Sequence, residues 1–332
     1  MSDIETPPSF HVAFESTSSK INLVRDEIRK VIYGQDQVIE QALVVLLSGG
    51  HMMLRGVPGL AKTKLVTTLA KVMGLDNKRI QCTPDLMPSD LIGAEILEEV
   101  DYGRRNFRFI EGPLFCQFLM VDEINRASPR TQSALLQAME EGNVTVTGRE
   151  HALPSPFHVL ATMNPLELEG TYPLPEAELD RFMMQIEITY PSLQAEKQII
   201  TQSLVEEPTP KAIVYASDLR EFQKTVRQMP LDESGTNSIL ALVRAGRPET
   251  TDIPEVRQYV HWGPGPRAAL ALALTIRARA TLHGRATPNM NDLEEMLLPV
   301  LRHRMALNYA ARADGVSLDL ILERLAEKIQ KF

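Results

Sequence analysis

A loop rich in glycine and proline, set between an apolar run and a helical segment, is the strongest constraint on the fold of this 332-residue chain. The apolar run 51–54 precedes the loop, and helical periodicity follows it as far as Met73. Backbone N–H groups in such loops point inward at an anion, and the following helix presents its positive end to the same anion. We therefore expect a strand, a phosphate-binding loop and a helix in succession. The loop and the residue after it are Gly56, Val57, Pro58, Gly59, Leu60, Ala61, Lys62, Thr63 and Lys64.

The loop has the spacing G-x-x-G-x-x-K-T, close to the nucleotide-binding pattern G-x-x-x-x-G-K-[ST]. In that pattern Lys62 reaches the β- and γ-phosphates of ATP, and the Thr63 hydroxyl binds Mg²⁺. Ala61 stands where the pattern has glycine, and we expect it to keep a helical backbone with a negative φ angle. The alternative is a glycine–proline turn followed by an exposed lysine, which the flanking strand and helix disfavour.

Polar side chains also follow two other apolar runs. Asp122 and Glu123 come after the run 118–121, and Asn164 comes after the run 158–163. Asp122 can orient Mg²⁺ through a water molecule, and Glu123 can polarise the attacking water as a base. Asn164 can position the same water. The alternatives are an ordinary acidic strand end and an asparagine that opens an Asn-Pro turn.

Five apolar runs, separated by helical segments, indicate an α/β fold with a parallel five-stranded sheet covered by helices on both faces. In such sheets the ligand lies beyond the carboxyl ends of the strands. The glycine-rich loop, the acidic pair and the asparagine all follow strands, so one shared site is predicted. The runs are 51–54, 79–83, 118–121, 158–163 and 182–188.

We divide the chain into a flexible N-terminal tail (1–18), a sheet domain (19–190) and an all-α domain (191–332). Within the sheet domain, the segments 96–110 and 143–153 alternate in polarity around turn residues and predict β-hairpins that are candidates for contacting another molecule. The helices of the last part are expected near 192–204, 217–228, 236–245, 266–283, 290–312 and 317–330.

Composition narrows the class of protein. The formal net charge of −8 offers no general basic surface for nucleic acid. Cys82 and Cys116 form neither a metal-like pair nor a disulfide framework, which favours a reducing compartment. The longest apolar stretch, 42–47, is far shorter than the ~20 residues that cross a bilayer. The N-terminus lacks the pattern of a signal peptide, so we expect a cytoplasmic protein without a membrane segment.

Several strings together resemble AAA+ ATPases, and more narrowly the MoxR family, over about residues 19–330. They are the glycine-rich loop, DEINRA (122–127), QSALLQAMEE (132–141), ATMNP (161–165) and EAELDRF (176–182). That family commonly has alanine at the position of Ala61. The resemblance implies a P-loop NTPase (AAA+) core with a C-terminal helical lid domain, and the two hairpins match insertions of this branch.

The resemblance also implies roles for individual residues. Asn164 matches sensor 1, and Arg181 matches an arginine finger that acts on ATP bound to the neighbouring subunit. Arg267 matches sensor 2, which reaches from the lid to the γ-phosphate, although GPGPR here replaces the usual GASPR. Arg181 and Arg267 could instead be ordinary surface residues, and Arg126 is a rival for the intersubunit role. The segment that packs on adenine comprises Val31, Ile32, Tyr33, Gly34 and Gln35.

These expectations combine into Mg²⁺-dependent ATP hydrolysis in a homo-oligomeric ring, expected to be a hexamer because one arginine acts on the next subunit. The resemblance further implies chaperone-like remodelling or maturation of partner proteins, often ones with von Willebrand factor A domains. Two alternatives stay open at this point: a nucleotide-gated binding module with little turnover, and a DNA-acting AAA+ motor. The net charge disfavours the motor, and Glu123 argues against the binding module.

Overall fold

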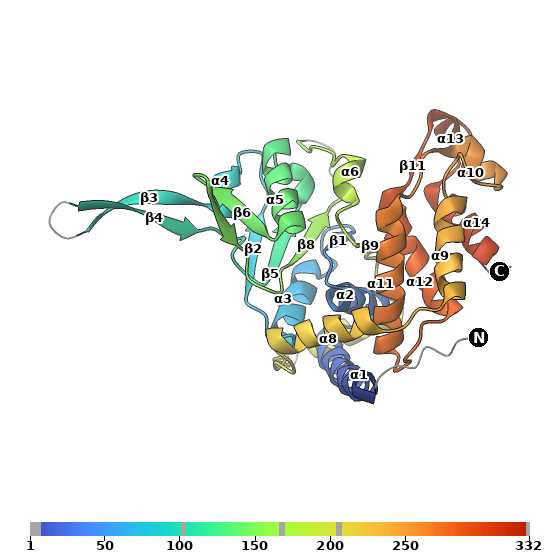
Figure 1. Ribbon diagram of the computed structural model, residues 1–332, viewed down its shortest axis with the longest axis horizontal. Coiled ribbons are helices and arrows are strands. Elements are labelled where there is room, and N and C mark those ends of the chain that lie inside the picture. Colours follow the sequence, from blue (N-terminus) through green and yellow to red (C-terminus); the bar gives the residue numbers. More distant parts are fainter. Residues whose placement is uncertain (1–7, 101–103, 166–169, 204–207, 330–332) are drawn as a thin grey trace.

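The computed structural model describes residues 8–100, 104–165, 170–203 and 208–329. A parallel sheet lies in the middle, with helices packed around it (Figure 1). The helices from residue 233 onward gather on one side of the sheet, and a long β-hairpin projects from the other side. The hairpin and these helices therefore lie on opposite sides of the central sheet.

The central sheet has five parallel strands in the order β2-β5-β8-β1-β9, which confirms the predicted sheet. Arg55 of β1 pairs with Met163 of β8, and Val121 of β5 pairs with Ala161 of β8. The carboxyl ends of these three neighbouring strands therefore form one edge. The strands are β1 (Met52–Arg55), β2 (Asn77–Gln81), β5 (Phe118–Asp122), β8 (His158–Met163) and β9 (Met184–Glu187).

Two hydrophobic cores, one on each face of the sheet, explain why the strands are apolar throughout. Met52 and Leu54 of β1 belong to the core that includes helix α2 (Asp36–Ser48). Met53, between them, belongs to the other core, with helix α5 (Pro129–Glu141). Successive side chains of a strand point to opposite faces, so burial on both sides leaves no room for alternating polar residues.

Helix α1 (Pro8–Arg29) begins inside the segment where we expected a flexible tail, so that expectation is wrong for residues 8–18. Phe10 and Phe14, one helical turn apart, are buried in a small core with Met229 and Ala280. Burial of two aromatic side chains stabilises this part of the helix and outweighs the local Ser/Thr content. Residues 1–7 lie outside the described part of the chain.

Both predicted hairpins are present, and each pairs antiparallel. Gly93 begins the longer hairpin with a φ angle of 99°, where a Cβ atom would lie 2.0 Å from the Ile110 carbonyl oxygen. Only glycine fits this closely paired base. The turn expected at 101–103 lies outside the described residues. The strands are β3 (Gly93–Val100), β4 (Arg104–Glu111), β6 (Asn143–Val146) and β7 (Arg149–Ala152).

The C-terminal part is helical, as predicted, but the single helix expected over 290–312 is interrupted. Helix α12 (Met290–Leu301) ends, the chain turns, and β11 (Ala306–Leu307) pairs with β10 (Val260–Trp262). Met305 is extended, and the Asn308 side chain caps the next helix by accepting a hydrogen bond from the backbone of Ala311. Pairing with β10 and this cap together explain the interruption.

The remaining elements of this part are α7 (Leu193–Ser203), α8 (Ala216–Gln228), α9 (Glu233–Ala245), α10 (Pro254–Tyr259), α11 (Pro266–Leu282), the 3₁₀ helix η2 (Arg302–Arg304), α13 (Tyr309–Ala313) and α14 (Leu318–Ile329). Those of the sheet domain are α3 (Lys62–Val72), α4 (Pro88–Ile92), the 3₁₀ helix η1 (Ile124–Arg126) and α6 (Glu176–Leu179). None of the helices in the described ranges is long and apolar enough to pass through a bilayer. The domain boundary near residue 190 stays a prediction.

Candidate active site

The glycine-rich loop connects β1 to α3 at the carboxyl edge of the sheet. Its first residue, Gly56, donates its N–H to the Met163 carbonyl of β8 at 3.3 Å. A Cβ atom at Gly56 would lie 2.7 Å from the Ile188 carbonyl oxygen, so a larger residue would push the loop away from β9. The Lys62 ammonium donates to the Gly56 carbonyl at 2.7 Å, which folds its side chain back over the loop.

Ala61 has a left-handed backbone, with φ 56° and ψ 26°, which corrects the expectation of a negative φ angle. It occupies the N-cap position of α3, where a reversal of the chain lets the loop enter the helix. Residues other than glycine adopt this conformation at a cost of about 1–2 kcal/mol. Alanine has no branch at Cβ, so it is less strained here than a β-branched residue would be.

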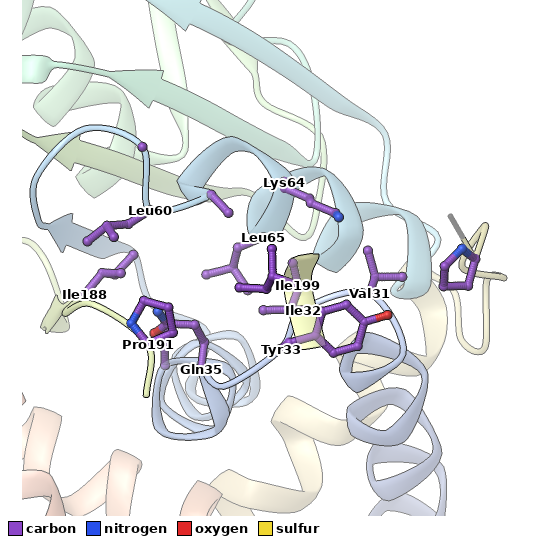
Figure 2. Close-up of a pocket in the computed structure, with 14 residues that line it drawn as sticks. Val31, Ile32, Tyr33, Gln35, Leu60, Lys64, Leu65, Ile188, Pro191 and Ile199 are labelled. Atoms are coloured by element: carbon purple, nitrogen blue, oxygen red, sulfur yellow. The ribbon is translucent and has the colours of Figure 1, made fainter. Parts of the chain in front are cut away.

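An apolar cavity of about 170 Å³ lies beside the loop (Figure 2). Val31, Ile32, Tyr33 and Gln35 line it, as expected for the adenine segment. The loop residues Gly59, Leu60 and Ala61 and the α3 residue Lys64 also line it. The sequence did not single out Ile188, Pro191, Ile199 or Pro208, which complete the lining after β9. An apolar slot that adjoins a phosphate loop fits a planar base whose phosphates extend into the loop.

Gly34 does not line the cavity, but it fixes the path of the adenine segment. Its φ angle is 68°, and a Cβ atom there would lie 2.3 Å from the Ala195 side chain of α7. Gln35 donates from its side chain to the Thr189 carbonyl at 3.1 Å. The segment before α2 is thereby held against the chain that leaves β9.

The acidic pair lies at the end of β5 and is held by neighbouring strands. Asp122, only 7% exposed, accepts a hydrogen bond from Arg79 of β2 at 2.7 Å and one from the Thr162 hydroxyl of β8 at 3.1 Å. Glu123 donates its backbone N–H to the same hydroxyl at 2.9 Å. Thr162 thus fixes the relative orientation of both acidic residues.

The Glu123 carboxylate accepts from Gln81 at 2.8 Å and from Arg126 at 3.0 Å. Its backbone has a φ angle of 55°, a conformation that is uncommon outside glycine and that clusters at functional sites. After this strained turn the carboxylate meets Gln81 of the neighbouring strand β2 and Arg126 of η1. Burial and the nearby acidic pair raise the pKa of the adjacent Cys82 thiol to about 12, which keeps this thiol protonated.

Three residues of this network were not predicted: Thr162, Arg79 and Gln81. Their signal was present in the strand periodicity, because Arg79 and Gln81 lie two residues apart and therefore on one face of β2. Recognising them required the strand order, which places β2 and β8 on either side of β5. Asn164 lies directly after β8 and is 4% exposed, and Thr63 is the second residue of α3. Both sit at the carboxyl edge, as expected.

Arg181 and Arg267 lie at the opposite edge of the sheet. They line a second cleft together with Gly50 and Met183, which lie one or two residues before the parallel strands β1 and β9. The glycine-rich loop begins where β1 ends, and the four residues of β1 span about 13 Å. The expectation that Arg267 reaches the γ-phosphate is therefore not met within one subunit.

The two arginines converge on one carboxylate, that of Glu140 in α5. Arg181 forms an ion pair with it at 2.8 Å, and Arg267 pairs with its other oxygen. Arg181 also donates to the Leu136 carbonyl at 2.8 Å, while its buried Nε has no hydrogen-bond partner among the described residues. Two guanidinium groups on one carboxylate leave a net positive cleft with an unused donor.

Comparison with known proteins gives separate family matches for the sheet domain and for the helical domain. The family model "ATPase family associated with various cellular activities (AAA)" matches residues 51–184, and an AAA lid domain matches residues 255–325. Chaperone MoxR1 of Mycobacterium tuberculosis is 40% identical over 326 residues, which cover 98% of this chain and 86% of that protein. Protein MoxR of Methylorubrum extorquens is 31% identical, covering 89% of this chain and 90% of that protein.

A solved structure supports the same relationship. A candidate ATPase from Cytophaga hutchinsonii matches with a TM-score of 0.89 and 40% identity, covering 96% of this chain and 97% of the other. The resemblance inferred from the sequence strings is thereby confirmed. With an AAA domain, a lid domain and relatives that match nearly its whole length, the chain belongs to the MoxR family of AAA+ ATPases.

Proposed function

We propose that this protein hydrolyses ATP with Mg²⁺ at sites shared between adjacent subunits and uses the reaction to remodel partner proteins. One observation carries the proposal: the phosphate loop and acidic pair lie at one edge of the sheet, and the paired arginines Arg181 and Arg267 lie at the other. Each edge holds half of the groups that phosphoryl transfer needs.

ATP would place its base in the apolar cavity beside Tyr33 and its phosphates against the N–H groups of the loop. The Lys62 ammonium would exchange the Gly56 carbonyl for β- and γ-phosphate oxygens. Thr63 and Asp122 offer the oxygen ligands that Mg²⁺ prefers. When bound, that ion neutralises charge on the phosphates. Arg79, now paired with Asp122, would then have to share or release that carboxylate.

Glu123 is the base in this proposal, and Asn164 positions the attacking water beside it. The carboxylate would leave Gln81 and Arg126 to accept a proton from that water. Each of these hydrogen bonds involves a partly exposed side chain, so the exchange costs little. The water then attacks the γ-phosphorus in line with the departing ADP oxygen.

Charge that develops on the transferred phosphoryl group would be neutralised by Arg181 and Arg267 of the neighbouring subunit. The net positive cleft around Glu140 supports this assignment. An arginine supplied in trans typically contributes on the order of 10³–10⁵ in rate. Activity would then require assembly, and we propose a homo-oligomeric ring, a hexamer by analogy with the family.

Remodelling of partner proteins is supported by the relative named a chaperone and by the projecting β3–β4 hairpin (Figure 1). The hairpin exposes Ile96, Leu97, Phe107 and Ile110, of which Phe107 is 70% exposed. Apolar groups held away from the body of a protein are suited to gripping another chain. Proteins with von Willebrand factor A domains are the partner class that we expect.

The test uses Glu123→Gln, which keeps the side-chain shape but removes the base. We expect turnover to fall on the order of 10²–10⁴, with ATP affinity unchanged. Unchanged turnover would reject Glu123 as the base. The same variant, loaded with ATP, serves as bait for the partner in an affinity capture with the ADP-loaded form as control. Recovery of nucleic acid alone would reject protein remodelling in favour of a DNA-acting motor.

A further inference from the structure

Arg304 lies in η2, directly after helix α12, and is among the largest fully buried side chains of the described residues. Its side chain is 2% exposed. A charged group rarely occupies such a position unless its partners satisfy it completely. The guanidinium of Arg304 therefore needs hydrogen-bond partners within the protein.

All five N–H donors of Arg304 are used. Its Nε donates to the Asp180 carboxylate at 2.6 Å, and one terminal nitrogen donates to the carbonyls of Asp180 at 3.1 Å and Phe182 at 2.7 Å. The other terminal nitrogen donates to the carbonyls of Met183 at 3.0 Å and Val300 at 2.7 Å. Four of the five bonds reach residues that flank Arg181 in the chain.

We propose that Arg304 is a positioning residue for Arg181. It holds the backbone on both sides of Arg181 and so sets where that guanidinium stands in the neighbouring subunit's site. The proposal rests on the proposed action of Arg181 in trans. Because Arg304 belongs to the helical domain and Arg181 to the sheet domain, it also ties the intersubunit arginine to the position of the lid.

The chemistry of this contact supports a role of Arg304 in orienting Arg181, in preference to a role in stabilising the fold alone. A buried ion pair is often no more stabilising than apolar residues of the same volume, so stability alone gives little reason for an arginine here. A planar fork with five fixed donors, by contrast, restricts the geometry of every carbonyl that it binds. His303 adds a hydrogen bond between its Nε2 and the Phe182 carbonyl at 2.8 Å. The segment 180–183 is thus tied to η2 from two adjacent side chains.

Geometry of this kind matters for rate, because a displacement of about 1 Å in a catalytic group costs about 10²-fold. Lysine at position 304 could still pair with Asp180, but its three donors cannot reproduce the fork. Arg304→Lys should therefore lower kcat at least about tenfold and leave the KM for ATP within about threefold, since the subunit's own nucleotide pocket is untouched.

The decisive test mixes two kinds of subunit. Arg304→Lys subunits have an intact Glu123 but a displaced Arg181, whereas Glu123→Gln subunits have no base but a correctly held Arg181. If Arg304 acts through Arg181 in trans, mixing them restores turnover several-fold above the sum of the separate variants. If Arg304 only stabilises the fold of its own subunit, mixing the variants restores no turnover.

Two further variants keep the outcomes distinct. Arg181→Ala mixed with Glu123→Gln reports whether an arginine acts in trans at all. Recovery with Arg181→Ala but not with Arg304→Lys overturns the role of Arg304 alone, and recovery with neither overturns both proposals. Arg279→Lys is the matched control, because Arg279 is a buried arginine that ties Glu40 to Asp292 elsewhere between the two domains. It should change thermal stability without this defect in turnover.

Because position 304 is buried, the Arg304→Lys substitution can prevent folding. Asp180→Asn then takes its place, because it removes the ion pair while Arg304 keeps its four backbone carbonyls. We expect a smaller loss of turnover with the same recovery on mixing. Wild-type turnover in both variants would overturn the proposal.

Discussion

Arg126 donates a hydrogen bond to the Glu123 carboxylate of its own subunit at 3.0 Å. The arginine that rivals Arg181 for the intersubunit role is therefore engaged beside the proposed base, three residues further along the chain. Arg181 lies at the opposite edge of the sheet, where a neighbour's nucleotide could meet it. The two arginines should consequently differ in how their loss affects turnover.

We expect Arg181→Ala to lower kcat by about 10³-fold and Arg126→Ala by less than about tenfold. The first removes charge from the transition state, whereas the second removes only a hydrogen bond that holds the base at rest. Steady-state ATPase assays at saturating ATP measure both. The reverse order of effects would assign the intersubunit role to Arg126.

Glu140 binds both Arg181 and Arg267, and it must release them before either can meet a phosphate. Glu140→Gln should therefore lower the protein concentration that gives half-maximal ATPase activity, by about two- to fivefold, since a surface ion pair is worth less than about 1 kcal/mol. The adjacent Glu141→Gln is the matched control, because Glu141 accepts a hydrogen bond from Gln137 of its own helix α5 and does not line the arginine cleft. Equal shifts in the two variants would contradict this role of Glu140.

The left-handed backbone of Ala61 leads to a prediction about nucleotide affinity. A β-branched residue in this conformation is strongly strained, so Ala61→Val should weaken ATP binding by about tenfold or more. Ala61→Gly relieves the strain and should keep the Kd within about threefold. Fluorescent-nucleotide titration measures both variants. Tight binding by the valine variant would show that the loop tolerates the strain or rearranges.

Stability should fall in mild acid because of buried histidines. Burial lowers the pKa of His158 from 6.5 to about 4, and burial with the nearby Arg304 charge lowers the pKa of His303 as well. Both imidazoles are neutral when folded, whereas the unfolded chain takes up protons below pH about 6.5. The contribution of His158 to stability is therefore complete above pH 6.5 and is lost as the pH falls toward 4.

The expected slope is about 1 kcal/mol per pH unit for each histidine, measured by chemical denaturation between pH 7 and pH 4.5. His158 accepts from the Gln223 amide and donates to the Gly50 carbonyl, so His158→Gln should retain part of this bonding and reduce the slope. His261, which is exposed, supplies the control His261→Gln. An unchanged slope in the first variant would point to other groups.

The β3–β4 hairpin should affect partner response without affecting basal turnover. Phe107→Ser removes an aromatic ring that is 70% exposed and far from the nucleotide cavity. We expect basal ATPase activity within about twofold of wild type and a loss of stimulation by the captured partner, read in the same assay. Val12→Ser, at a residue that is 71% exposed on α1, tests whether any loss of exposed apolar surface has the same effect.

The parts of the fold that the sequence predicted best were those with local causes. Strand β8 was predicted with its observed ends, because burial on both faces gives a mainly apolar run, which ends at Asn164 and Pro165. The start of α1 was missed because Phe10 and Phe14 gain their stability from contacts with Met229 and Ala280, more than 200 positions away. The break after α12 likewise depends on pairing with β10.

The residues of the candidate site also fall into those with local causes and those that depend on distant contacts. Glu123 and Asn164 could be assigned from single strands, since a polar residue after an apolar run marks the carboxyl edge. Thr162 could not be assigned, because its contact with Asp122 depends on the order of strands in the sheet. Arg267 was matched to a role by its string, but where it lies depends on how the helical domain packs against the sheet.

Because the two half-sites lie on opposite edges of one sheet, the number of complete sites depends on whether the assembly is closed. If the proposed half-sites meet between subunits, the copies join head to tail, and such contacts yield either a closed ring or an open helical row. In a ring every subunit completes one site and borrows another. In an open row one end carries a nucleotide pocket that no arginine reaches, and the other end carries an arginine pair with nothing to act upon. The ratio of working sites to bound nucleotides would then report directly whether the assembly has closed.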